Sequence, residues 1–316
     1  MELSTYTNNS RVQEFVLLGF FTGTNLDIVL FLLFLFIYLF TIFGNAGIIF
    51  LVYHNSQMHT PMYFFICSLS FVDLCYSSDI APQMIVNILS EKKTISYVGC
   101  AIQLFIFCAL GSSECCLLAV MAYDRYVAIC NPLNYSMVMQ QKTCLGLLCA
   151  VYTVGFLHSV IETCCTFSLS FCSSNVLHHF ACDFPPLLKI SCTDTTVNEI
   201  ILFIFTSSII MPAVLVIFVS YFSIFLAILK INILEGRKKA FSTCVSHITS
   251  VALFFGTGVY VYLSPKSKYS TENGTVATLI YAVMIPMSNP VIYSVRNKDV
   301  KLAIETVFLG KAKLRT

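Results

Sequence analysis

The chain has 316 residues, of which 57% are hydrophobic and only 11% are charged, and its mean hydropathy is +0.82. Soluble domains carry about 25% charged residues, so this composition excludes an ordinary soluble protein and indicates a multi-pass membrane protein. The formal net charge of +2 is too small to indicate a nucleic-acid partner.

Apolar stretches long enough to cross a bilayer recur along the whole chain. They occupy residues 26–53, 60–88, 98–123, 142–166, 198–229, 238–263 and 272–293. The sequence therefore predicts an all-α membrane protein, a bundle of seven transmembrane helices over 26–293. No secretory leader is recognised in the polar tail at 1–25, so we expect the first span to act as its own insertion signal.

The segment 294–316 predicts a short helix on the inner membrane surface. Val300, Ile304, Val307 and Phe308 recur there at helical spacing, with lysines around them. Such an amphipathic helix lies in the interface, with its apolar side in the lipid.

The distribution of basic residues predicts the orientation. Twelve of the 18 lysines and arginines fall on the side of the C-terminus and six on the side of the N-terminus. The side richer in basic residues is normally cytoplasmic, so we expect an extracellular N-terminus in the plasma membrane. Asn8, in the sequon Asn8-Asn9-Ser10, is then a candidate glycosylation site.

Four of the fifteen cysteines lie in or beside the stretches expected outside the cell, where disulfides persist. They are Cys100, Cys172, Cys182 and Cys192. Four cysteines allow three pairings, and their spacing does not choose among them. The other eleven lie in apolar spans or near the inner face, where small packing residues are expected.

Two carboxylates lie mid-way along predicted spans, Asp73 in the second and Glu114 in the third. A charge in lipid costs several kcal/mol unless it is paired or solvated. With Ser288 and Asn289 of the seventh span, the two carboxylates could surround a cation such as sodium or share a proton. A purely structural polar cluster is the alternative.

Asp124-Arg125-Tyr126 ends the third span at its inner side. A simple interpretation is an interfacial pair whose charges reach water. A sharper hypothesis is a latch, in which Asp124 holds Arg125 in one state and releases it in another. Pro286 and Pro290 interrupt the seventh span, and proline removes a helix hydrogen bond, so we expect a hinge there.

Several motifs together resemble one family. They are Gly44-Asn45, PMYFF at 61–65, LSFVD at 69–73, MAYDRYVAIC at 121–130, SY at 220–221, KAFSTCVSH at 239–247 and NPVIYS at 289–294. They are similar to those of the vertebrate odorant receptors, which are rhodopsin-like G-protein-coupled receptors. The resemblance implies a receptor without enzymatic activity, with disulfides Cys100–Cys182 and Cys172–Cys192.

The resemblance also implies a pocket in the outer half of the bundle for a small, mainly apolar odorant. We expect its walls to include Phe107, Cys108, Gly111, Ser112, Phe205, Thr206, Ile209, Phe255, Val259, Tyr262, Leu279 and Ala282. Ser112 and Tyr262 are the expected orienting groups. The third span has no acid between Cys100 and Glu114, which weighs against an amine receptor.

Glu162 departs from the family pattern, which more often has a neutral amide there. It follows His158 by four residues, so both lie on one face of the fourth span. We expect a buried pair, with contact to a cationic ligand as the alternative. A metal site at His178, His179, Cys182 and Asp183 is not expected, because a disulfide would remove the Cys182 thiolate.

On the inner side, the resemblance implies coupling to a stimulatory G protein that raises cyclic AMP. The residues implied are Asp124, Arg125, Tyr126, Tyr221, His247, Asn289, Pro290 and Tyr293. A receptor for a non-olfactory small molecule is the main alternative. A transporter is disfavoured because no repeats or matched broken helices occur, and an enzyme because no nucleophile stands with a base. No cofactor is expected apart from sodium or a shared proton at Asp73 and Glu114.

Overall fold

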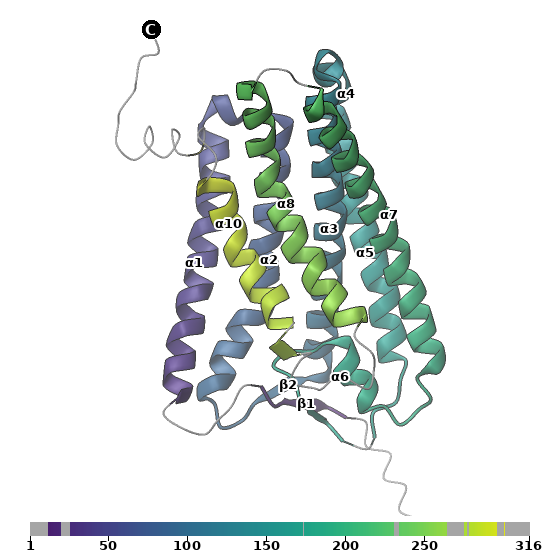
Figure 1. Cartoon of the computed structure of the whole chain (residues 1–316). Helices are drawn as coiled ribbons and strands as arrows, with labels where there is room; N and C mark the ends of the chain where they lie inside the picture. The colour runs from purple at the N-terminus through teal and green to yellow at the C-terminus, as the bar shows by residue number, and fades with distance from the viewer. Residues whose placement is uncertain are drawn as a thin grey trace, which may run out of the picture.

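The computed structural model describes residues 12–19, 26–172, 174–230, 234–263, 275–276, 278–295 and 300. Side chains are described in that range except at 234–243, 259–263 and 295. The long helices lie side by side in one bundle (Figure 1). The predicted C-terminal helix and Asn8 lie outside the described residues, apart from Val300, which is buried.

The bundle is built from the spans that the sequence predicts. Its helices are α1 (Leu26–His54), α2 (Pro61–Leu89), α3 (Tyr97–Cys130), α5 (Gln141–Phe167), α7 (Thr196–Leu229), α8 (Leu234–Leu263) and, for the seventh span, the π-helical turn η3 (Ile280–Met284) continued by α10 (Ile285–Val295). The short elements are η1 (Ser56–Met58), η2 (Pro132–Asn134), α4 (Tyr135–Val138) and α6 (Phe184–Lys189). The prediction of a seven-helix bundle is confirmed.

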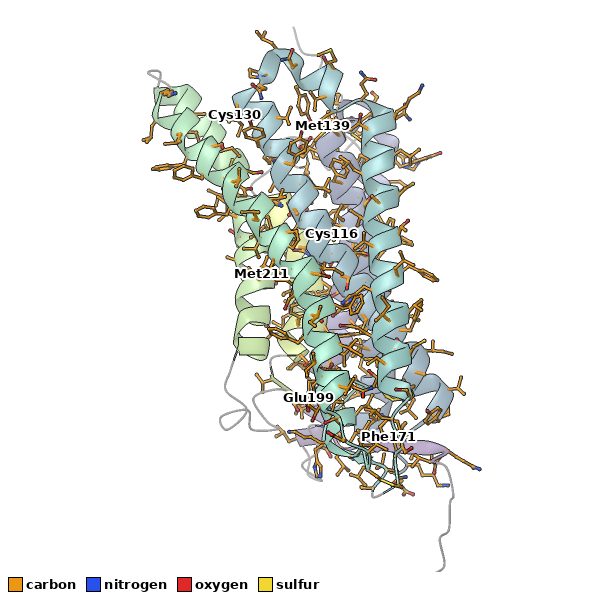
Figure 2. All side chains as sticks on the ribbon, turned by 90° about the vertical axis from the view of Figure 1, so that its right-hand side faces the viewer. Cys116, Cys130, Met139, Phe171, Glu199 and Met211 are labelled. Carbon is orange, nitrogen blue, oxygen red and sulfur yellow. A yellow bond between two sulfur atoms is a disulfide. The ribbon has the colours of Figure 1, made fainter. Side chains whose placement is uncertain are left out.

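Five helices, α1, α2, α3, α5 and α7, are long and apolar enough to cross a membrane, and α8 contains a shorter apolar stretch, Cys244–Gly258. Large apolar side chains point outward, as Phe43 (73% exposed) and Phe203 (72%) do. Figure 2 shows side chains on every face of α3, α5 and α7, with Cys130 and Met139 near one end and Phe171 and Glu199 near the other. Such a surface suits lipid, because each helix satisfies its own backbone hydrogen bonds.

Helix α3 is the centre of the bundle, because it packs against α2, α5, α7 and α8. Gly155 of α5 sets the closest approach to α3: a Cβ there would overlap Ser113 Oγ and lie 2.6 Å from the Ala109 carbonyl oxygen. One turn further along α5, Ser159 donates a hydrogen bond to the Phe105 carbonyl oxygen. The small residues therefore bring α5 close enough to α3 for polar side chains to meet.

Helix α1 supplies a hydrogen bond to the proline-interrupted backbone of the seventh span. Pro290 has no N–H, which leaves the Pro286 carbonyl without its helical partner. Asn45 Nδ2 donates to that oxygen at 3.0 Å and also to the Thr41 carbonyl at 3.0 Å. Gly44 lets the proline ring approach, since a Cβ there would lie 3.1 Å from it. The adjacent Gly44 and Asn45 thus hold the kinked helix against α1.

We therefore expect Asn45→Ala to lower the thermal stability of the purified protein. The Pro286 carbonyl would be left buried and unpaired, at a cost of about 1–3 kcal/mol. Gly47→Ala is the matched control on the same helix, because a Cβ at Gly47 meets nothing within 4 Å. Equal melting temperatures for the two variants would contradict this role of Asn45.

A small sheet covers one end of the bundle (Figure 1). Strand β1 (Glu14–Leu17) lies between β2 (Thr94–Ser96) and β3 (Val176–Leu177). It pairs antiparallel with β2, Glu14 opposite Ser96, and parallel with β3, Val16 opposite Val176. Phe15 and Leu17 are completely buried, so the sheet anchors the segment before α1 to the loops after α2 and α5.

Candidate functional site: an outer pocket and an inner polar network

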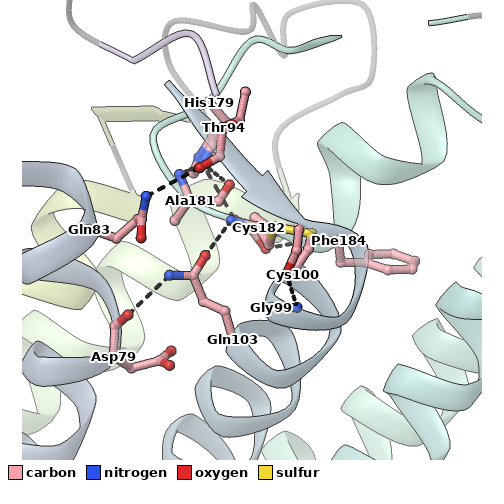
Figure 3. The surroundings of a disulfide bond; sticks show 12 residues. Asp79, Gln83, Thr94, Gly99, Cys100, Gln103, His179, Ala181, Cys182 and Phe184 are labelled. Carbon is pink, nitrogen blue, oxygen red and sulfur yellow. Dashed lines mark hydrogen bonds and ion pairs between the residues drawn. A yellow bond between two sulfur atoms is a disulfide. The ribbon is translucent and has the colours of Figure 1, made fainter. Parts of the chain in front are cut away.

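A disulfide joins the loop between α5 and α7 to the start of α3. Cys100 is bonded to Cys182, and both are buried. Gln103, one turn further along α3, accepts a hydrogen bond from the Cys182 backbone N–H at 2.9 Å and donates to the Asp79 carbonyl oxygen of α2 at 3.0 Å (Figure 3). The loop is therefore fixed both covalently and by hydrogen bonds across the outer end of α2 and α3.

The same loop turns inward beyond the disulfide. Cys172 is bonded to Cys192, the second pair that the resemblance implies. Phe180 belongs to a buried cluster that includes residues of α1, α2 and η3. Burial lowers the pKa of the His179 imidazole, and the nearby Asp183 carboxylate opposes this shift. The loop forms an apolar roof over the outer half of the bundle.

Asp183 ties this roof to the seventh span. Its Oδ2 accepts a hydrogen bond from Thr278 Oγ1 at 3.1 Å, while its Oδ1 accepts one from the Phe184 backbone N–H at 2.7 Å. The His179 ring lies 4.0 Å from Oδ2. A movement of the roof is thus coupled directly to the residues that precede η3.

The predicted pocket residues on α3 lie beneath this roof. The Phe107 ring lies 5.0 Å from the Tyr76 ring of α2, centroid to centroid. Gly111 faces the same tyrosine, whose ring would be 3.6 Å from an added Cβ. Cys108 packs against the cluster that contains the Cys100–Cys182 disulfide. These residues form an apolar wall between α3, α2 and the loop.

A chain of polar side chains crosses from α3 through α5 to α7. Ser112 Oγ lies 2.8 Å from His158 Nδ1. His158 Nε2 and Glu162 Oε1 form an ion pair at 3.2 Å, without the alignment of a hydrogen bond. Thr206 Oγ1 donates to the same Oε1 at 2.7 Å. The expected pair of His158 and Glu162 therefore links two of the predicted pocket residues.

Four further predicted pocket residues pack against buried clusters. Ile209 and Phe255 pack against the buried cluster of α3, α7 and α8, and Leu279 packs with Ala282 against the cluster of α1 and α2. Phe205 lies next to Thr206 on α7 and is 36% exposed.

Helix α7 is apolar over most of its surface, so periodicity alone separates its inner face poorly from its lipid face. Val259 and Tyr262 lie in α8, and their side chains are outside the described residues.

In the middle of the bundle, Asn289 of α10 connects α2 with α8. Its Nδ2 donates to both oxygens of Asp73, at 3.0 and 3.2 Å, and its Oδ1 accepts a hydrogen bond from Ser250 at 3.2 Å. Glu114 is 1% exposed, and its Oε2 has no hydrogen-bond partner among the described side chains. The kinked seventh span is thus held to two neighbours through one amide.

At the inner end of α3, Asp124 does not hold Arg125. Ion pairs in the described part of the chain are confined to His158–Glu162 and His179–Asp183. Asp124 instead accepts a hydrogen bond from Tyr135 Oη of α4 at 2.8 Å. Among the described residues Asp124 and Arg125 therefore form no ion pair, although the Arg125 charge acts on the Asp124 carboxylate.

Arg125 is 8% exposed and lies within electrostatic range of Tyr221 and His247. Tyr221 Oη and His247 Nδ1 are 2.6 Å apart, which connects α7 with α8. Tyr293 is buried, and Tyr126 packs against the cluster of α7 and α8 at the inner end. The predicted coupling residues thus converge on the inner ends of α3, α7, α8 and α10.

Comparison with known proteins decides the family. The model of the olfactory receptor family matches residues 34–311. The chain belongs to the olfactory receptor family. Olfactory receptor 5I1 of Homo sapiens is 50% identical over 307 residues, 97% of this chain and 98% of that receptor. Olfactory receptor 5T18 of Mus musculus is 50% identical over 308 residues, 98% of this chain and 95% of that receptor.

The olfactory receptor also has the rhodopsin fold. It superposes on a crystal structure of squid rhodopsin with a TM-score of 0.70 at 19% identity, covering 89% of this chain and 81% of rhodopsin. Because it belongs to the olfactory receptor family, it is a multi-pass, seven-helix G-protein-coupled receptor without enzymatic activity.

Two polar contacts of the olfactory receptor escaped the sequence analysis. Tyr135 and Gln103 are ordinary polar residues in the sequence, and only the packing of α4 and of the outer loop brings them to Asp124 and Cys182. A weak signal was present for Gln103, an amide within an apolar span, where a polar group requires a partner.

Proposed function

We propose that this olfactory receptor binds a small, mainly apolar odorant in the outer half of the bundle, beneath the loop fixed by Cys100–Cys182. One observation carries the proposal: a polar chain from Ser112 to Thr206 lies among otherwise apolar walls. Such an arrangement suits a ligand that is held by apolar contact and oriented by one or two hydrogen bonds.

The receptor then passes the signal inward to a stimulatory G protein that raises cyclic AMP. The ligand shifts the equilibrium only by its preference for the active state. The route runs from the pocket through Asn289 to Arg125, and the inner ends of α3, α7 and α8 separate to admit the G protein. Two contacts support this. Asn289 with Asp73 holds the seventh span to α2, and Tyr221 with His247 joins α7 to α8, two of the helices that must move apart.

The receptor lies in the plasma membrane with its N-terminus outside and its C-terminus in the cytoplasm. Residues 1–25 are the outer tail, 26–293 the bundle, and 294–316 an inner amphipathic helix and tail. The basic residues support this orientation, with twelve of 18 on the C-terminal side. The disulfides support it as well, because both join segments at the end that carries the sheet.

Asp73 and Glu114 together need a positive charge between them, because two carboxylates buried in a membrane repel each other. A shared proton or a sodium ion supplies it. The unpartnered Glu114 Oε2 supports this assignment, as an acceptor left open in the centre of the bundle.

Cyclic AMP in cells that express the receptor with a stimulatory olfactory-type G protein tests the proposed function. A broad panel of volatile compounds is expected to contain agonists. Ser112→Ala is expected to weaken them by about threefold to tenfold, the equivalent of one hydrogen bond, at unchanged surface level. Silence across the panel with confirmed surface expression would contradict the odorant assignment.

A further inference from the structure

Glu162 is the residue at which the polar side chains of α3, α5 and α7 meet. Its carboxylate accepts the Thr206 hydroxyl of α7 at 2.7 Å and faces His158 Nε2 at 3.2 Å. The Cys108 thiol of α3 lies beside the same carboxylate. Side chains from three helices therefore converge on one acid that is only 13% exposed. Hydrogen bonds donated to a carboxylate stabilise its ionised form.

Burial then requires a compensating charge near Glu162. Within the described ranges, its ion-pair partner is His158, whose side chain is 6% exposed. The other ionisable groups facing this region are acids: Asp79 of α2 and Asp183 of the loop both act on Cys108. An unpaired carboxylate among further acids is costly in a membrane. A proton on His158 would leave the pair neutral overall.

A charge on His158 would fix the direction of its contact with Ser112. Both ring nitrogens of an imidazolium carry hydrogen. With Nε2 facing Glu162, Nδ1–H would donate to Ser112 Oγ across the 2.8 Å contact. The serine hydroxyl would accept that bond, and its own hydrogen would be free for another acceptor. Thr206, in contrast, already donates its hydroxyl hydrogen to Glu162, so that hydrogen is not available to a ligand.

We infer that the His158–Glu162 pair makes Ser112 a hydrogen-bond donor to the odorant, so that the receptor prefers ligands with an acceptor group, namely aldehydes, ketones and esters, over the corresponding alcohols. The inference rests on the proposed function and names its ligand class. A carbonyl oxygen accepts the Ser112 hydrogen directly. An alcohol also carries a hydroxyl hydrogen, which loses its hydrogen bond to water on binding and needs a new acceptor in the pocket. Glu162 is thus a positioning residue for selectivity.

The test compares potencies within matched pairs. Aldehydes or ketones and the alcohols of the same carbon skeleton, on linear, cyclic and aromatic frameworks, are assayed by cyclic AMP in cells that express the full-length receptor. Wild type is expected to respond to the carbonyl member at a several-fold lower concentration. In Ser112→Ala the preference is expected to disappear.

In Glu162→Gln the preference is expected to shrink towards equality, because a neutral amide no longer requires a charged His158. Cys164→Ala is the control on the same helix, since Cys164 is an exposed free cysteine. It should keep the wild-type preference. A structural role for Glu162 would weaken both members of each pair alike and leave the ratio unchanged. Alcohols that are more potent than their carbonyl partners would overturn the inference while leaving the receptor function intact.

A second measurement needs no odorant. Nitrogen-15 NMR of histidine-labelled, purified receptor distinguishes an imidazolium from a neutral ring, and a His158→Asn variant identifies the signal. We expect both nitrogens of His158 to be protonated at neutral pH in wild type and the ring to become neutral in Glu162→Gln. A neutral His158 in wild type would overturn the inference, whether or not any odorant activates the receptor.

Discussion

Arg125→Ala is expected to abolish odorant-driven cyclic AMP while the receptor still reaches the cell surface. Arg125 is 8% exposed at the inner end of α3 and acts electrostatically on Tyr221 and His247, which join α7 to α8. Without this charge, the inner ends of the helices lose the group that a G protein would engage. We expect the maximal response to fall by more than about tenfold, the effect of losing a switch that is worth over 1.4 kcal/mol.

Lys142→Ala is the matched control for this prediction. It removes the same charge at the start of α5, where Lys142 is exposed. We expect a near-normal response, measured as maximal cyclic AMP at equal surface labelling. A normal agonist response in Arg125→Ala would refute its role in coupling. A loss of surface receptor in that variant would assign Arg125 to folding instead.

Cys100→Ser is expected to have the largest effect on stability. The bond to Cys182 closes a loop of 82 residues and fixes the apolar roof to α3. Removal of a native disulfide costs about 2–5 kcal/mol, more for longer loops. The variant also loosens the loop whose backbone bonds to Gln103. We therefore expect most of the protein to be retained inside the cell, measured as the surface fraction of total receptor.

Two further cysteine variants provide comparisons for the surface fraction of Cys100→Ser. Cys172→Ser opens a disulfide that spans only 20 residues, so its surface loss should be smaller. Cys149→Ser alters an exposed free cysteine and should behave as wild type. Equal surface fractions for Cys100→Ser and Cys149→Ser would contradict a stabilising role of the outer disulfide.

The fold was predictable from the sequence because membrane-spanning helices require long apolar stretches. The third span was expected from residue 98, and α3 begins at Tyr97. The small sheet at β1 was not predicted, because its strands are only two to four residues long and leave no periodic pattern. The π-helical turn at 280–284 also escaped, since nothing in the sequence but the nearby Pro286 marks it.

The candidate site was predictable only in part. The i,i+4 spacing placed His158 and Glu162 on one face, and they pair as expected. Spacing within one helix, however, says nothing about partners on others, so Ser112 and Thr206 could not be assigned to that pair from the sequence. The same limit applies to Asp124, because only the packing of α4 gives it a tyrosine partner.

Nucleotide exchange on a purified stimulatory G protein is the most direct measurement of the whole mechanism. It uses the purified receptor in lipid, with and without an agonist found in the cell assay. We expect the agonist to accelerate exchange in wild type, a higher agonist concentration to be needed in Ser112→Ala, and no acceleration in Arg125→Ala. Exchange that ignores the agonist, or that proceeds equally in all three proteins, would contradict a receptor that couples the outer pocket to the inner end of α3.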